Sequence, residues 1–160
     1  MIKSLIKLAF FLVVGILVYN YFFGTPEEKQ QSREIFSEVR DLTRSAFNLL
    51  KSEKAKFDDG KYDDAVDQVG GLLENLRGKA ETLKENKGLL DQLAELQDRQ
   101  RALDAKLHRP GMQQYDQDGR STIADSSDRR EIEREWEDLV RRTERLMQEM
   151  EKQAEREAGQ

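Results

Sequence analysis

The chain opens with an almost unbroken apolar segment and turns polar near residue 24. Residues 8–23 read LAFFLVVGILVYNYFF, and two more apolar residues before Lys7 extend the segment to residues 5–23. As an α-helix this stretch would span about 28 Å, close to the roughly 30 Å of a bilayer's hydrocarbon core. The aromatic residues at its end suit one membrane interface, and Lys7 can reach back to the other. The pattern predicts a membrane anchor over residues 1–24.

A cleaved signal peptide and a buried core helix are the alternatives for this segment. A signal peptide shares the basic start, but its apolar core is usually about 7–15 residues long and ends in small residues. Here the candidate cleavage positions hold tyrosine, asparagine and phenylalanine. The residues that follow fit a helix start, with Thr25 as N-cap, Pro26 as first residue and Glu28 closing a capping box. We therefore favour an uncleaved anchor that leads into a second helix.

Beyond the anchor, apolar or small residues recur at alternating spacings of four and three residues, which is the period of one helix face. We call each such run a seam. The pattern predicts an all-α protein with about four helices after the transmembrane helix, packed as a helical bundle or coiled coil. The four seams are Ile35, Val39, Leu42, Ala46 and Leu49; Tyr62, Val66, Val69, Leu73, Leu76, Ala80 and Leu83; Leu89, Leu93, Leu96, Gln100, Leu103 and Leu107; and Ile132, Trp136, Leu139, Thr143, Leu146 and Met150.

Breaks in this pattern locate the helix ends. The sequence KFDDGK separates the first two seams, and a change of register at residues 86–88 predicts a helix end there, with its glycine as C-cap. One continuous helix across that point is the alternative. Pro110 stops the third helix, and the polar residues 109–127 follow. Asp128, with Glu131 three residues later, predicts the N-cap of the fourth helix.

Short connections between the first three helices make them antiparallel neighbours. We therefore expect an antiparallel three-helix hairpin bundle over residues 25–108 and a flexible polar linker over residues 109–127. A C-terminal amphipathic helix over residues 128–160 completes the chain. The sequence leaves open whether this last helix folds back on the bundle or projects away from it.

Composition and charge exclude several classes of function. The 160 residues include no cysteine and one histidine, His108, which excludes disulfides, thiolate metal sites and a cysteine nucleophile. Two of the 27 basic residues and none of the 32 acidic residues precede residue 25, so the rest of the chain carries a formal net charge of −7. This excess of negative charge disfavours nucleic acid as a partner.

No catalytic constellation is visible. Helix-end capping accounts for His108, and no serine–histidine–aspartate set can be built around it. The pair Gly70-Gly71 lacks the lysine and hydroxyl residue of a phosphate-binding loop, and it indicates a kink or a close helix crossing instead. We therefore expect no enzymatic activity, no cofactor, no metal site and no small-molecule substrate.

Residues 55–69, AKFDDGKYDDAVDQV, resemble the centre of a tetratricopeptide repeat. The Gly-x-Tyr-x-x-Ala of that motif is matched by Gly60, Tyr62 and Ala65, and the resemblance covers about residues 47–74. It implies a helix–turn–helix that binds protein. A shift of about 34 residues, the usual repeat length, finds no second copy. An ordinary helical hairpin is therefore the competing interpretation.

Residues 116–127, DQDGRSTIADSS, resemble a degraded EF-hand loop, with Asp116 and Asp118 at the first two ligand positions. Arg120 stands where an oxygen ligand belongs, and Ser127 stands where a bidentate glutamate is needed. We favour a solvated loop. A further hypothesis, from a different class of function, is a small enzyme or a calcium sensor that uses this linker.

The leading hypothesis of function is a single-pass, membrane-anchored helical scaffold or accessory subunit that mediates protein–protein contacts in a membrane complex. Lys3 and Lys7 favour a cytoplasmic N-terminus and hence an extracytoplasmic helical domain. The alternative is a self-assembling, homo-oligomeric coiled-coil tether, similar to a phage spanin or an envelope structural protein in general organisation.

Candidate interaction residues are aromatic or apolar side chains on the seams or beside them. Trp136 is the strongest of these because large aromatic residues dominate protein interfaces, although core burial explains it equally well. The full set is Phe36, Phe47, Phe57, Tyr62, Trp136, Leu139, Leu146 and Met150.

Overall fold

The computed structural model describes residues 26–84, 86–118 and 120–159. The predicted transmembrane helix over residues 5–23 lies outside the described residues. Among the helices that are described, none combines the length and the apolarity that a membrane span requires. The elements in chain order are α2 (Pro26–Asp58), α3 (Tyr62–Ala80), α4 (Lys87–Leu107), β1 (Gln113–Tyr115), β2 (Ser121–Ile123) and α5 (Ser126–Ala158).

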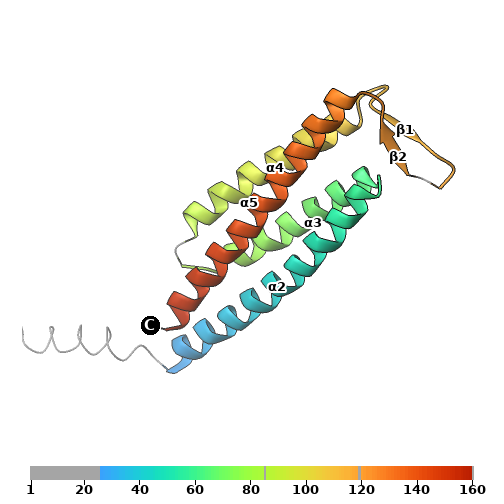
Figure 1. Cartoon of the computed structure of the whole chain (residues 1–160). Coiled ribbons are helices and arrows are strands. Elements are labelled where there is room, and N and C mark those ends of the chain that lie inside the picture. Colours follow the sequence, from blue (N-terminus) through green and yellow to red (C-terminus); the bar gives the residue numbers. More distant parts are fainter. Residues whose placement is uncertain (1–25, 85, 119, 160) are drawn as a thin grey trace, which may run out of the picture.

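The four helices form one bundle in which successive helices run in opposite directions (Figure 1). α2 packs against α3 and α5, and α4 packs against α3 and α5, so each helix has two neighbours. The prediction of a predominantly α-helical bundle is confirmed. The position of the C-terminal helix, which the sequence left open, is also clear: α5 folds back and lies between α2 and α4.

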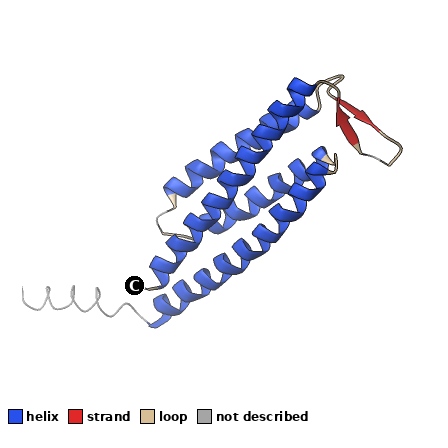
Figure 2. Cartoon of the chain, viewed as in Figure 1, coloured by secondary structure: helices blue, strands red, loops and turns tan. Residues whose placement is uncertain are grey.

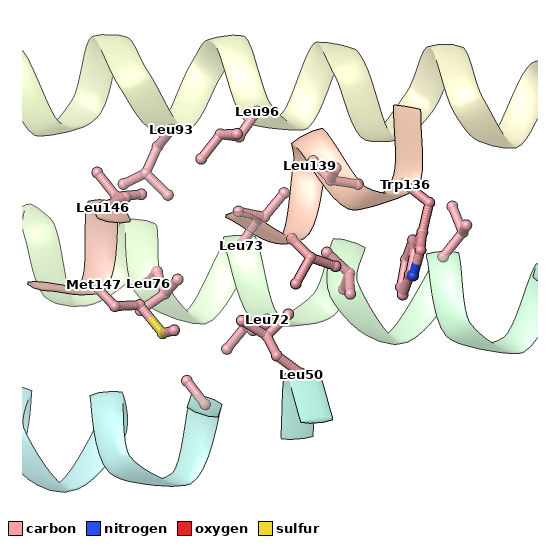
Figure 3. Packing of buried hydrophobic residues seen from close by; sticks show 14 of the residues in the cluster. Leu50, Leu72, Leu73, Leu76, Leu93, Leu96, Trp136, Leu139, Leu146 and Met147 are labelled. Carbon is pink, nitrogen blue, oxygen red and sulfur yellow. The ribbon is translucent and has the colours of Figure 1, made fainter. Parts of the chain in front are cut away.

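All four helices contribute to one common core (Figure 3). The second, third and fourth seams are mostly buried in it, whereas the first seam is partly wrong: Leu50 is buried on α2, and Leu49 is only partly buried. Leu73 and Leu76 of α3, Leu93 of α4 and Leu146 of α5 are fully buried there. Because burial of a leucine side chain contributes roughly 1.5–3 kcal/mol, this shared interior is the main source of stability. Buried Thr143 satisfies its hydroxyl within its own helix, donating to the backbone carbonyl of Leu139 at 2.9 Å.

Two predicted helix boundaries are wrong. α3 ends at Ala80 instead of near residues 86–88, and the last carbonyls of α3 are capped locally, with the Thr82 hydroxyl donating to the Lys79 carbonyl at 2.7 Å. The glycine expected as a C-cap, Gly88, lies in the first turn of α4. α5 begins at Ser126 instead of after an N-cap at Asp128.

Asp125 is the N-cap of α5. Its carboxylate accepts a hydrogen bond from the backbone N–H of Ser127 at 2.6 Å and so satisfies one of the free amides of the first turn. The same contact lowers the pKa of Asp125, chiefly through hydrogen bonds from the Ser127 hydroxyl and backbone. The N-cap therefore lies three positions before the one predicted, one helical turn further from the first apolar residue of the seam.

The segment expected to be a flexible linker contains an antiparallel β-hairpin, β1–β2, at the end of the bundle (Figure 2). Gln114 pairs with Thr122, and Tyr115 pairs with Ser121. The side chain of Asp116 closes the turn by accepting the backbone N–H groups of Asp118 and Arg120, each at 2.9 Å. Residues that favour β-structure on both sides of this turn therefore pair as strands within the segment predicted to be a linker.

Candidate interaction surface

The turn between α2 and α3 is built on the residues of the tetratricopeptide resemblance. Gly60 has a φ of +81°, and a Cβ at this position would lie 2.6 Å from the carbonyl oxygen of Ser121. Tyr62 meets the ring of Phe57 edge to face, with centroids 4.6 Å apart, and Ala65 is fully buried. The glycine therefore permits both the turn conformation and a close approach, while the other two residues pack the hairpin.

The β-hairpin is attached to this turn by hydrogen bonds. The backbone N–H of Ser121 donates to the Gly60 carbonyl at 2.9 Å, and the Ser121 hydroxyl donates to the same oxygen at 3.1 Å. The carboxylate of Asp63, in the first turn of α3, accepts from the Gln113 amide at 2.8 Å and from the Tyr115 hydroxyl at 2.5 Å. Two segments about fifty residues apart in the chain are thereby joined at one end of the bundle. We call this end, made of the α2–α3 turn, the first turn of α3 and the β-hairpin, the tip.

Tyr115 is the exposed aromatic residue of this tip. Its side chain is 60% exposed, and it is the large hydrophobic residue that stands out as exposed among those the structure describes. The hydrogen bond to the Asp63 carboxylate is the main reason that its pKa is raised to about 12. The hydroxyl is therefore neutral and directed at Asp63, while much of the ring faces solvent.

The two edges of the hairpin differ. On the β2 side, Ser121 is bonded to Gly60, and the guanidinium of Arg129 donates to the Ile123 carbonyl at 3.2 Å. On the other side, β1 makes no backbone hydrogen bond outside the hairpin to any described residue. The edge of β1 is therefore open within the described chain.

Carboxylates surround this end of the bundle. Asp63, Asp116 and Asp118 lie in or against the hairpin. His108, the C-cap of α4, is bonded to the backbone carbonyl of Asp104, and that bond is the largest cause of its raised pKa. The Asp104 carboxylate adds to this effect, and so does the charge of Asp63. Arg120 lies in the hairpin turn and Arg129 on the β2 side, so the excess of negative charge is on the β1 side of the tip.

Most of the candidate interaction residues from the sequence lie inside the chain's own core. Phe57, Trp136, Leu139, Leu146 and Met150 are at most 2% exposed. The indole of Trp136 stacks on Phe57 with centroids 4.5 Å apart and ring planes 1° from parallel (Figure 3 shows Trp136). Phe36, Phe47 and Tyr62 are partly buried against the same core. The apolar faces of the helices therefore pack against one another within a single chain.

Sequence reasoning missed the residues of the tip, Asp63, Tyr115 and Ser121. A signal for the hairpin was present, because tyrosine and Ser-Thr-Ile flank the turn sequence DQDG. The contact of Asp63 with the hairpin had no local signal, since it joins residues far apart in the chain.

The α4–α5 side of the bundle carries a charged groove of about 420 Å³. Lys106 lies there between Glu131, at 2.6 Å, and Glu135. These hydrogen bonds raise the pKa of Lys106, and the bond from Lys106 lowers the pKa of Glu131. The groove is open to solvent and its acidic and basic side chains pair with one another. None of these groups therefore lies in the kind of apolar environment that prepares a residue for acid–base catalysis.

In the part of the chain that the structure describes, no group of three or more histidine, aspartate or glutamate residues is arranged to hold a metal ion. The loop that resembles an EF-hand uses Asp116 to bind its own backbone. Comparison of the chain with protein-family models, with curated proteins and with solved structures finds no match.

Proposed function

We propose that the protein is a single-pass, membrane-anchored scaffold or accessory subunit whose helical bundle mediates protein–protein contacts, without enzymatic activity of its own. The apolar residues 5–23 form the anchor in this proposal. Lys3 and Lys7 hold the N-terminus in the cytoplasm, so that the bundle lies on the extracytoplasmic side.

One observation carries this proposal: the start of α2 and the β-hairpin lie at opposite ends of the bundle (Figure 1). α2 has 33 residues, which corresponds to about 50 Å at 1.5 Å per residue. A bundle attached through residue 26, with its axis along the membrane normal, would hold its tip at up to that distance from the bilayer. An elongated helical bundle with the exposed Tyr115 at its far end suits a scaffold better than it suits a catalyst.

The alternative, a homo-oligomeric coiled-coil tether, has less support. Its contacts were expected on the fourth seam, and Trp136, Leu139 and Leu146 of that seam are buried within a single chain. Assembly through these residues would require the bundle to open, at the cost of the core that it already has.

Two measurements on the full chain test the proposal. Alkaline carbonate extraction of native membranes should leave the protein in the pellet, and protease added from the extracytoplasmic side should degrade the bundle. Release by carbonate would contradict the anchor, and protection from external protease would contradict the orientation. Co-expression of two differently tagged copies should yield no co-purification of one with the other. Efficient pairing of the two tags would favour the tether.

A further inference from the structure

From the asymmetry of the hairpin, we infer that the open edge of β1 (Gln113–Tyr115) is a docking site for an extended, basic segment of a partner protein, which adds a third strand to the sheet. This inference rests on the proposed function, because it assigns the partner contact to one surface.

The connection that carries the hairpin is longer than the fold requires. α4 and α5 are antiparallel neighbours, yet 18 residues separate Leu107 from Ser126, whereas helix connections in bundles usually take about 2–8 residues. The described residues of this connection add little to the core, since only Ser121 and Ile123 among them are buried. β1 and β2 are nevertheless held against the helices by their bonds to Asp63 and Gly60.

The backbone of β1 is oriented for strand addition. Hydrogen bonds join Met112 to Ala124 and Asp116 to Arg120. Because residues in antiparallel strands alternate in the direction of their backbone groups, those of Gln113 and Tyr115 point away from β2. The amide of Ser121, which pairs with Tyr115, follows the same alternation and bonds to Gly60 on the far side. Outward N–H and C=O groups on a free edge bind an extended chain.

The charge of the tip identifies the occupant. Asp63 contacts the side chains of β1, and Asp116 and Asp118 follow the strand directly. These three carboxylates outnumber Arg120 of the same turn, so lysine or arginine side chains on the added strand would be attracted. The exposed ring of Tyr115 gives an apolar contact for an intervening side chain. A second copy of the chain is a poorer occupant, because pairing β1 with β1 would bring the same carboxylates together.

The test uses the full chain in mild detergent and a dye-labelled peptide of eight alternating lysine and valine residues. A glutamate–valine peptide of the same pattern is the control probe. Fluorescence anisotropy should show saturable binding of the basic peptide, weakened by salt, and no binding of the acidic one. Absence of binding of the basic peptide up to millimolar concentration, or equal binding of both peptides, would overturn the inference.

Two matched pairs of variants locate the site. Tyr115→Pro and Tyr115→Ala both remove the ring, but only the proline removes the outward N–H, and proline is tolerated at such an edge position. Binding should be at least tenfold weaker for Tyr115→Pro than for Tyr115→Ala. Asp118→Lys should weaken binding several-fold relative to Glu137→Lys, which changes the charge equally on the exposed surface of α5. This second pair decides the question if the proline variant unfolds.

Equal affinities within the pairs would overturn the inference, and so would a homodimer of the wild-type chain that Tyr115→Pro abolishes. Each of these results would exclude the docking site on β1 without excluding the proposed scaffold function. A protein that co-purifies with the chain from native membranes would leave the scaffold proposal intact even if it bound elsewhere.

Discussion

Substitution of Gly71 by alanine should stabilise the bundle. Gly71 lies in the interior of α3, is exposed, and a Cβ at its position would meet no atom within 4 Å. A glycine in a helix interior is about 0.8–1 kcal/mol less favourable than alanine, because it loses more backbone freedom on folding. Gly71→Ala should therefore raise the free energy of unfolding by about 1 kcal/mol. For a chain of this size the unfolding midpoint would rise by roughly 2–4 °C.

The neighbouring Gly70 is a matched control with a different environment. A Cβ there would lie 3.1 Å from the side-chain nitrogen of Gln100, which donates to the Val66 carbonyl at 3.2 Å. Loss of that hydrogen bond would cost about 1 kcal/mol and offset the gain in helix propensity. Thermal unfolding of the full chain in detergent, followed by circular dichroism, measures both variants. Equal stabilisation by the two substitutions would refute the α3–α4 packing, and destabilisation by Gly71→Ala would contradict the open surroundings of this position.

Three further substitutions test other parts of the structure. Trp136→Ala should lower the free energy of unfolding by about 3–5 kcal/mol in urea denaturation, since it leaves a large cavity in the core; a loss below about 1 kcal/mol would contradict the packing of α5. Gly60→Ala should cost more than about 1 kcal/mol, measured from the thermal midpoint, because of its positive φ and its contact with Ser121. Hydrogen bonding by Arg141 is the main cause of the lowered pKa of Asp138, so its contribution to stability is present above about pH 4 and is lost as pH falls through the lowered pKa. Asp138→Asn should flatten this acid dependence of the midpoint, and an unchanged dependence would show that the pair contributes nothing.

The helices were predictable because their seams are long and regular. Four-three spacing over five or more positions, as in the run from Tyr62 to Leu83, identifies a helix face whatever it packs against. The ends were less predictable, because capping depends on which of several polar residues reaches the free amides. Asp125 makes the cap of α5, although Asp128 with Glu131 fits the sequence pattern equally well.

The candidate interaction residues were harder to predict than the helices. A seam that contains Trp136 and Leu146 has the same sequence whether it packs within one chain or between two. The hydrogen bond from the Tyr115 hydroxyl to the Asp63 carboxylate, which holds the hairpin against α3, joins residues 52 positions apart. The local sequence pattern carries no information about such a pair. The contact can be recognised only once the arrangement of the helices in space is known.

The measurement that tests the scaffold proposal most directly is the mass and protein content of the intact assembly, purified from native membranes in mild detergent. We expect one copy of the 18.6 kDa chain together with a second protein in fixed stoichiometry. A lone monomer, or a clean multiple of 18.6 kDa with no second protein, would contradict it.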